Sequence, residues 1–282
     1  MRIHQVLVGA REGDAITQIA LNLRSVLNRF GGSEVFARHV DPSVGGHVRP
    51  IDQLVPECGP SDVVILHVSI GDDIVWDAVA ATPGRVWVSY HNITPSQFFS
   101  LDPDFAAHLD QGRRQLLELA PRIERIFTES EYNRQDLMSM GFDDVVVLPG
   151  FLDPDRLAGL PSDPHFGRKL HDRAPAEMIL FVGQLLPHKR PDLLVAAHHL
   201  LITHHRPMAT LVLVGHHPSA RFAGQVAAFV DSLGLADRVW IAGGVTDSQL
   251  GELYRRADVL ATASQHEGLC LPVVEAMAMS VP

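Results

Sequence analysis

The sequence predicts an α/β fold in which two doubly wound parallel sheets form two domains. Three observations predict it: a length of 282 residues, short apolar strand candidates separated by helical patterns, and a change of texture near the middle of the chain. At about 150 residues per domain, this length indicates roughly two domains. Short, mostly apolar strands are expected of parallel sheets that are buried on both faces.

The first half begins with a strand and alternates with helical patterns. The strand candidates are Gln5–Val8, Val35–Arg38, Val63–Val68, Val86–Tyr90, Ile126–Thr128 and Val145–Leu148. Helices are predicted over Thr17–Asn28, Phe105–Leu119 and Asn133–Met140, where apolar residues recur at helical spacing. Asn133 is acceptable at a helix start, and Gly141 follows as a C-terminal stop. We therefore predict a first domain over residues 1–150.

Prolines, glycines and polar residues without periodicity follow, and we interpret residues 151–176 as a linker. A second alternation then forms a predicted domain over residues 177–282. Its strands are Met178–Val182, Thr210–Val214, Val239–Ala242 and Val259–Thr262, and its helices are Pro191–Thr203, Phe222–Leu233 and Asp247–Arg256. The chain stops at Pro282 where this pattern calls for another strand, so we expect an incomplete, C-terminally truncated second domain.

Composition excludes several classes of protein. The formal net charge of -10 disfavours a nucleic-acid-binding surface. Two cysteines, Cys58 and Cys270, are too few for a disulfide framework. The chain has no apolar run near the roughly 18 residues of a membrane span, and its start is too short and polar for a secretory signal. A cytoplasmic protein is the expectation, with peripheral contact at the inner face of the membrane left open.

Familiar motifs of other sites are missing. There is no P-loop, and the turn after the first strand, Gly9–Asp14, lacks the glycine pattern of dinucleotide sites. Paired histidines occur at His198-His199, His204-His205 and His216-His217, which raises a metal site as an alternative. Adjacent histidines on a helix point apart, so exposed polar histidines are favoured and no metal is expected.

The segment Phe181–Asp192 predicts an anion site. A strand leads into Gly183, a loop with Lys189 and Arg190, and a helix that starts at Pro191. A cation and a helix N-terminus would meet at the carboxyl edge of the sheet, where both favour a phosphate. A solvated basic loop is the alternative.

A second segment, Ser264–Met279, predicts another helix start at the same edge. Glu267 lies before the helix and Glu275 about one turn inside it, in an apolar run where a carboxylate needs hydrogen-bond donors. Sugar or ribose hydroxyls would be natural donors. The backbone N–H groups of Gly268, Leu269 and Cys270 would face an anion at the helix N-terminus. A capping carboxylate and an exposed helix carboxylate are the alternative.

These residues together resemble a known family. The pattern Phe-Val-Gly-x5-Lys189, the strand ending at Gly215 and Glu267-x7-Glu275 are similar to the nucleotide-sugar domain of retaining glycosyltransferases of family four, which have the two-domain GT-B fold. In the first half, the run from Val88 to Pro95 with Phe98-Phe99, and Ser130-Glu-Tyr-Asn133, resemble the acceptor-side domain of a bacterial mannosyl- or glucosyltransferase subgroup.

The resemblance implies roles for matching residues. Lys189 would neutralise the diphosphate leaving group, Glu275 would hydrogen-bond the ribose, and Glu267 the hydroxyls of the donor sugar. His91 would reach the donor sugar near the reacting carbon. Gly13 would lie on the loop facing the phosphates. Further donor-binding groups would come from Gly183, Gln184, Arg190, Gly268, Leu269 and Cys270.

The implied reaction is hexose transfer with retention of configuration, from a GDP- or UDP-hexose to a glycan or polyprenyl-linked acceptor, without a cofactor or an obligatory metal. One departure concerns Gln184, where the family usually has Arg, so the diphosphate site loses a cation unless Arg190 or another arginine compensates. Two alternatives remain: a non-catalytic remnant that binds a sugar nucleotide or a partner, and a sugar-nucleotide epimerase. Four arginines are candidates for contact with anionic lipid or a polyprenyl-diphosphate acceptor, although a solvated helix face is favoured: Arg113, Arg114, Arg122 and Arg125.

Overall fold

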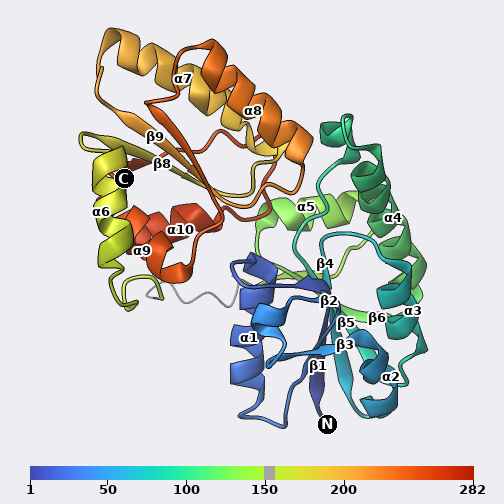
Figure 1. The fold of residues 1–282 in the computed structure, drawn as a ribbon. Helices are drawn as coiled ribbons and strands as arrows, with labels where there is room; N and C mark the ends of the chain where they lie inside the picture. The colour runs from blue at the N-terminus through green and yellow to red at the C-terminus, as the bar shows by residue number, and fades with distance from the viewer. Residues whose placement is uncertain (149–155) are drawn as a thin grey trace. The chain divides into compact units, whose positions relative to one another are not determined.

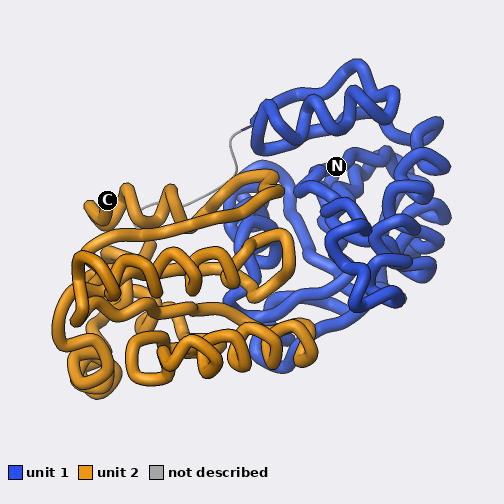
Figure 2. The backbone as a smooth tube through the Cα atoms, turned by 90° about the horizontal axis from the view of Figure 1, so that it is seen from above, with its two compact units in different colours: residues 1–152 blue, residues 153–282 orange. Residues whose placement is uncertain are grey.

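The structure is a computed structural model that describes residues 1–148 and 156–282. The chain divides into two compact units, Met1–Leu152 and Asp153–Pro282 (Figure 2). Each unit is built on its own parallel sheet with helices on both faces. The predicted α/β class with two doubly wound sheets is confirmed.

Unit 1 contains a seven-stranded sheet of order β3-β2-β1-β4-β5-β6-β7. Its strands are β1 (Ile3–Ala10), β2 (Val35–Val40), β3 (Val48–Pro50), β4 (Val63–Val68), β5 (Arg85–Tyr90), β6 (Ile123–Thr128) and β7 (Val145–Val147). Its helices are α1 (Ala15–Leu27), α2 (Leu54–Glu57), α3 (Asp73–Ala81), α4 (Pro103–Leu119) and α5 (Glu131–Ser139). Figure 1 shows α1 on one side of the sheet and α3 and α4 on the other.

The two ends of helix α5 illustrate how the local sequence sets the bounds of a helix. The cap of α5 is Ser130, whose hydroxyl accepts a hydrogen bond from the Asn133 N–H at 3.1 Å, so Asn133 lies in the first turn and is not the helix start. Gly141 follows with φ of 96°, the left-handed conformation that favours glycine as a C-terminal stop. The predicted end of this helix is thus confirmed, and its start moves towards the N-terminus.

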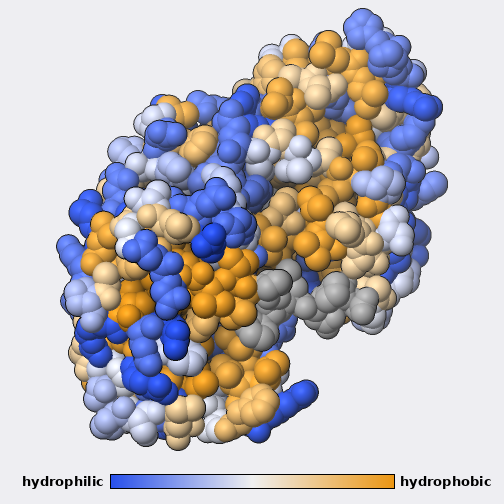
Figure 3. Space-filling model, turned by 180° about the vertical axis from the view of Figure 1, so that it is seen from behind, coloured by the Kyte–Doolittle hydropathy of each residue, from blue (hydrophilic) through white to orange (hydrophobic). Residues whose placement is uncertain are grey.

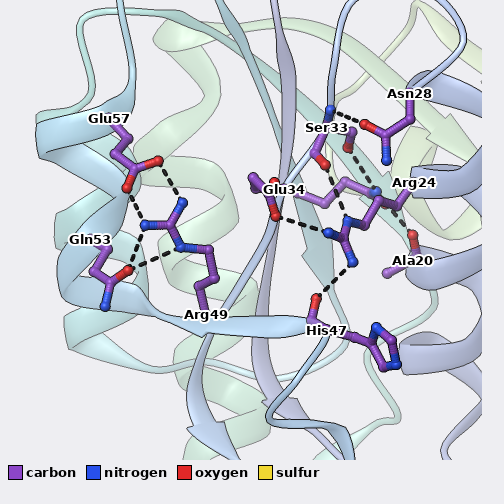
Figure 4. A network of polar contacts seen from close by, with 10 residues as sticks. Ala20, Arg24, Asn28, Ser33, Glu34, His47, Arg49, Gln53 and Glu57 are labelled. Atoms are coloured by element: carbon purple, nitrogen blue, oxygen red, sulfur yellow. Dashed lines mark hydrogen bonds and ion pairs between the residues drawn. The ribbon is translucent and has the colours of Figure 1, made fainter.

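Arginine side chains hold the outer strands of this sheet. Arg24 of α1 pairs with Glu34 just before β2, with 3.2 Å between Nη2 and Oε2. Arg49 of β3 reaches Gln53 at 2.7 Å and both carboxylate oxygens of Glu57 (Figure 4). These contacts fasten a short edge strand that the sequence analysis did not identify.

Unit 2 contains a four-stranded sheet of order β10-β9-β8-β11. Its strands are β8 (Met178–Val182), β9 (Thr210–Val214), β10 (Val239–Gly243) and β11 (Val259–Leu260). Its helices are α6 (Pro164–Arg173), α7 (Pro191–His204), α8 (Ala220–Ser232), α9 (Asp247–Arg256) and α10 (Leu271–Ala278).

Successive side chains along the strands of unit 2 point to opposite faces of the sheet and pack into two separate hydrophobic cores. Phe181 and Leu213 pack with α7 and α8, whereas Leu180 and Val212 pack with α6, α9 and α10. Figure 1 shows these two groups of helices on opposite sides of β8 and β9. A strand buried on both faces therefore reads as a continuous apolar run, which is why these strands were predictable.

Helix α6 corrects the interpretation of residues 151–176 as a linker. The Asp163 carboxylate accepts from the Phe166 N–H at 3.0 Å, and Pro164 occupies the first turn, where its missing N–H costs nothing. Phe166 and Leu170, one turn apart, are buried in the core beside α9. Proline here starts a helix and does not mark a structureless segment. Residues 149–155, including the first part of the predicted linker, lie outside the described residues.

Candidate functional site

The strand order of unit 2 creates a switch point between β8 and β11. From β8 the chain proceeds to β9 and β10 on one side, then returns to place β11 on the other side of β8. The loops that leave β8 and β11 therefore diverge at the carboxyl ends of adjacent strands. In open α/β sheets, ligands bind in the crevice outside such a point.

Lys189 and Glu267 meet at this switch point, one from each loop. The Lys189 ammonium donates to Glu267 Oε2 at 2.5 Å, and the Ser264 hydroxyl donates to Glu267 Oε1 at 2.8 Å. The backbone joins the same loops, because the Gln265 N–H donates to the His188 carbonyl at 2.8 Å. Both side chains are partly exposed, at 20% for Lys189 and 23% for Glu267. The structure thus brings together two residues that are far apart in sequence.

His188 contributes no charge beside this pair at neutral pH. Burial, followed by the nearby Lys189, lowers the pKa of His188 to about 3. Because the His188 imidazole is neutral, Lys189 is the charged residue of the two, and its ammonium group pairs with Glu267.

Arg190 starts helix α7 in a left-handed conformation, with φ of 51° and ψ of 46°. Its guanidinium makes a bidentate contact with Asp192, in which Nη2 lies 2.8 Å from Oδ2. The Arg190 guanidinium is therefore paired with a residue in the first turn of α7. Gln184 is half-buried and follows Gly183, whose N–H donates to the Val214 carbonyl at 2.8 Å.

The N-terminus of α10 also lies in this part of unit 2. Cys270 is its cap residue but makes no side-chain capping hydrogen bond, and Pro272 lies in the first turn. Within residues 156–282, the N–H groups of Leu269 and Cys270 donate to no backbone carbonyl. Burial, followed by the charge of Glu267, raises the pKa of the Cys270 thiol, so the thiol stays protonated.

Glu275 is held by two residues that the sequence analysis missed. The Tyr254 hydroxyl donates to Glu275 Oε2 at 2.8 Å, and Arg156 Nη2 lies 3.4 Å from Oε1. Arg156 also pairs with Asp247 at the start of α9. Burial raises the pKa of Glu275, although both hydrogen bonds oppose this shift. The hydrogen bonds from Tyr254 and Arg156 hold the partly buried Glu275 carboxylate in one orientation. A carboxylate that binds hydroxyl groups of a ligand needs such a fixed orientation.

Glu275 is expected to make unit 2 less stable as the pH rises. Its pKa is raised in the folded state, so its contribution to the free energy of unfolding is present at low pH and is lost as the pH increases above about 4.5. The variant Glu275→Gln should lack this loss. Urea unfolding at pH 4 and pH 7 measures it: the free energy of unfolding should fall between these values more in the wild type than in the variant.

A matched control is Glu252 on α9, where the sign is reversed. The Ser162 hydroxyl holds the pKa of Glu252 below its usual value, so its contribution is present above about 4.5 and is lost on acidification. For Glu252→Gln, the advantage of the wild type should therefore grow towards pH 7. The same sign for both variants would contradict this account of Glu275.

In unit 1, Gly13 lies in the loop after β1 with φ of 72°, a conformation suited to glycine. This loop borders a cavity of about 770 Å³ at the carboxyl ends of β1, β2 and β4. The unit 1 sheet has its own switch point here, between β1 and β4. The polar lining residues are Arg11, Asp14, Arg38, His39, Asp41, His67 and Ser69.

His91 follows β5, and both of its ring nitrogens are engaged inside unit 1. Nε2 lies 2.7 Å from His67 Nδ1, and Nδ1 contacts Glu129 Oε1. His67 and Glu129 are further residues of this edge that the sequence analysis did not single out. A histidine near the end of β4 and an acidic residue just after β6, the two strands that flank β5, are the signal that would have found them.

Several other predicted features have structural partners. His198 was expected to be exposed but is buried, and its Nε2 lies 3.1 Å from the Arg238 carbonyl oxygen. Arg113 pairs with Asp136 at 3.1 Å, and Arg122 donates to the Thr82 carbonyl at 2.9 Å. Two of the four arginines considered for lipid contact thus have structural roles. Within residues 1–148 and 156–282, no three His, Cys, Asp or Glu residues are grouped as metal ligands.

None of the described helices combines the length and the apolar character that crossing a bilayer requires. On the face seen in Figure 3, hydrophobic residues gather in patches between hydrophilic ones. Exposed large apolar side chains in the described residues include Phe30, Leu200 and Met277. Isolated exposed apolar residues are common on soluble proteins and carry no argument for a partner.

Comparison with known proteins finds a matching family, related sequences and similar structures. Residues 167–282 match the family described as glycosyl transferases group 1. The D-inositol 3-phosphate glycosyltransferase of Kineococcus radiotolerans is 34% identical over 179 residues, which are 61% of this chain and 40% of that protein. The protein of the same name from Mycobacteroides abscessus is also 34% identical, over 62% of this chain and 37% of its own length. The chain thus spans about two fifths of these curated relatives.

Solved structures resemble the whole chain. Anabaena HepE in complex with UDP-glucose superposes with a TM-score of 0.79 at 16% identity, covering 100% of this chain and 79% of HepE. Sucrose-phosphate synthase from Thermosynechococcus elongatus has a TM-score of 0.72 at 16% identity, covering 100% of this chain and 80% of that one. At these identities the similarity establishes the fold, which is the GT-B type predicted from the sequence.

Proposed function

We propose that the chain is a retaining hexosyltransferase that moves a hexose from a nucleoside-diphosphate sugar to a glycan or lipid-linked acceptor. The observation that carries this proposal is the contact of Lys189 with Glu267, 2.5 Å apart, at the switch point of unit 2. A cation and a carboxylate side by side suit a ligand with an anionic group next to hydroxyl groups. A sugar joined to a diphosphate is such a ligand.

The comparisons support the same substrate class. The matching family is one of glycosyl transferases, and the named relatives are glycosyltransferases. HepE, which has the same fold, has been solved with UDP-glucose and with UDP. A nucleotide sugar that binds outside the carboxyl ends of β8 and β11 would occupy the place where doubly wound sheets hold their ligands.

The chemistry requires charge stabilisation at the leaving group. During transfer, the bond between the anomeric carbon and the diphosphate oxygen breaks, and its electron pair stays on the diphosphate. The acceptor oxygen attacks from the same face and passes its proton to the departing oxygen, so the configuration is retained. In this proposal the Lys189 ammonium turns from Glu267 towards the diphosphate. Glu267 then accepts from the sugar hydroxyls, and no metal is required for either contact.

The remaining donor contacts follow the same division of roles. Glu275, oriented by Tyr254 and Arg156, would accept from the ribose hydroxyls. The N–H groups of Gly268, Leu269 and Cys270 would donate to the sugar and the phosphates at the start of α10. In unit 1, Gly13 on the loop after β1 and His91 after β5 are the residues to which the family resemblance assigns donor contacts.

One observation favours a second candidate, a chain that binds a sugar nucleotide without transferring the sugar. Gln184 has no charge and the Arg190 guanidinium is engaged by Asp192, so neither residue gives Lys189 a second free cation. A charge pair at 4 Å is worth about 4 kcal/mol at an intermediate dielectric constant, which makes the missing cation significant for the leaving group. Binding would survive this loss better than turnover.

Calorimetry and product analysis together test the proposal. The chain is titrated with UDP-glucose, GDP-mannose, UDP and GDP, then incubated with each donor and with inositol 3-phosphate or a polyprenyl phosphate. We expect binding of one nucleoside diphosphate and its sugar, and a product with the anomeric configuration of the donor. Binding without product would favour the second candidate, and an altered sugar would indicate an epimerase. Absence of binding to every nucleotide would contradict the proposal.

A further inference from the structure

A continuous chain of buried polar side chains crosses the sheet of unit 1. Gln5 of β1, His67 of β4, His91 after β5 and Glu129 after β6 follow one another in the order in which their strands lie in the sheet. Gln5 Oε1 lies 3.0 Å from His67 Nε2, and His67 Nδ1 lies 2.7 Å from His91 Nε2. His91 Nδ1 then contacts Glu129 Oε1, and the side chains of this last pair are 5% and 8% exposed.

The orientation of Gln5 fixes the direction of the whole chain. Its Nε2 lies 2.9 Å from the carbonyl oxygen of Ala20, an atom that can only accept a hydrogen bond. The amide nitrogen must therefore face Ala20, and Oε1 must face His67. Since Oε1 can only accept, His67 carries its proton on Nε2 and donates it to Gln5.

His67 consequently presents a lone pair to His91. Burial lowers the pKa of His67 well below its usual value, which agrees with a neutral ring that has one N–H. The planes of the two rings differ by 5°, and their centroids lie 5.0 Å apart. Two rings that meet edge to edge in a common plane have this arrangement, with the N–H of one pointing at the nitrogen of the other. His91 therefore donates its Nε2–H to His67 Nδ1.

The second nitrogen of His91 faces a carboxylate. Glu129 accepts through Oε1, and its Oε2 lies 3.5 Å from the Asn133 amide nitrogen, a further donor. A neutral His91 would set the lone pair of Nδ1 against an oxygen lone pair. With both ring nitrogens donating, His91 is an imidazolium ion, and Glu129 is its counterion in a buried place where an unpaired charge would be costly.

Other charged groups near this chain have partners of their own. Asp136 of α5 pairs with Arg113 of α4 at 3.1 Å. Arg38, which lines the cavity together with His67, pairs with Asp72 at 3.2 Å. Asp14, on the loop after β1, accepts from the Thr17 N–H at 2.9 Å. The elements that pack around His91 thus supply Glu129 as its direct ionic contact.

We propose that Glu129 and His67 are positioning residues for His91: Glu129 keeps the ring in its charged form, and His67 fixes its orientation. The carboxyl edge of the unit 1 sheet then carries an imidazolium–carboxylate pair in a fixed orientation. Because both ring N–H groups are donated internally, His91 neither takes nor gives a proton in the reaction. The part of this inference that concerns a ligand rests on the proposed function, whereas the charge and orientation of His91 do not.

Nitrogen-15 NMR of the full chain with labelled histidine tests the charge without any donor. At pH 7 the wild type should show two ring N–H signals for His91, assigned by their loss in His91→Gln. Glu129→Gln should show one signal, while His67→Gln should retain two, because the carboxylate sets the charge. The control Glu131→Gln, which removes an exposed glutamate paired with Arg134, should retain two. A single ring N–H in the wild type, or two in Glu129→Gln, would overturn the proposal.

The wild-type spectrum decides the charge of His91 even if Glu129→Gln fails to fold, which circular dichroism of each variant reveals. A second measurement uses turnover of the donor that the chain accepts. A displaced catalytic geometry costs about 10²-fold, so Glu129→Gln should lower kcat by this order with a smaller change in KM, and Glu131→Gln should change neither. An unchanged kcat in a folded Glu129→Gln variant would overturn the ligand part. A chain that turns over no donor would contradict the proposed function and leave the NMR result standing.

Discussion

Replacing Lys189 by alanine is expected to lower turnover of a nucleoside-diphosphate hexose by about 10²–10³-fold, the usual cost of removing one well-placed group that stabilises developing charge. The substitution removes the ammonium from the switch point of unit 2 and leaves Glu267 with the Ser264 hydroxyl, 2.8 Å away, as its hydrogen-bond donor. Binding of the free nucleoside diphosphate should weaken as well, because the same charge attracts the ground-state phosphates. Steady-state kinetics and calorimetry with UDP and GDP measure the two effects separately.

The chain offers a matched control, since Lys169 is its only other lysine. The Lys169 ammonium lies over the Trp240 ring, 5.4 Å from its centroid, and belongs to α6. Lys169→Ala removes the same charge and the same side chain from unit 2, so effects of net charge on the nucleotide are equal in both variants. We expect turnover by Lys169→Ala to stay within about twofold of the wild type, as is usual for surface substitutions. Equal losses in both variants, or none in Lys189→Ala, would contradict the role of Lys189.

Much of the fold was predictable because buried parallel strands are apolar throughout. The strand Val63–Val68, all of whose residues are buried, has the bounds that the sequence indicated. Helix α6 was missed because the prolines in and around it were interpreted as breaks, although Pro164 after a capping Asp163 is a signal for a helix start. Strand β3 was missed because three residues at a sheet edge, held by the contacts of Arg49, carry no periodic pattern.

Residues of the candidate site could be predicted only where a strand, a loop and the start of the next helix follow one another within one short segment of the sequence. Lys189 and Glu267 could be placed at one sheet edge because each follows a recognisable strand. The partners of Glu275 could not, since Arg156 is 119 residues away in sequence and Tyr254 belongs to a different helix. The charge of His91 likewise depends on a chain of contacts through three other strands. Local periodicity does not contain such tertiary information.

Gly215→Ala is expected to destabilise unit 2 by about 2–6 kcal/mol, the sum of backbone strain and overpacking. Gly215 follows β9 with φ of 146°, and a Cβ added there would lie 2.0 Å from the Gly183 carbonyl oxygen and 2.5 Å from its carbon. Both of those atoms are backbone, so no side-chain rotation relieves the clash. The loop that carries Lys189 begins at Gly183, so the substitution should also weaken nucleotide binding. Urea unfolding and calorimetry measure the two effects.

The comparison that isolates this close approach is Gly224→Ala in α8. A Cβ at Gly224 meets no atom within 4 Å, and alanine is favoured over glycine in a helix by about 0.5–1 kcal/mol. Gly224→Ala should therefore stabilise the chain, whereas Gly215→Ala should destabilise it. If Gly215→Ala unfolds at the same urea concentration as the wild type, the ends of β8 and β9 are not packed backbone against backbone. The loop of Lys189 would then not be fixed by Gly215, and its place beside Glu267 would need another cause.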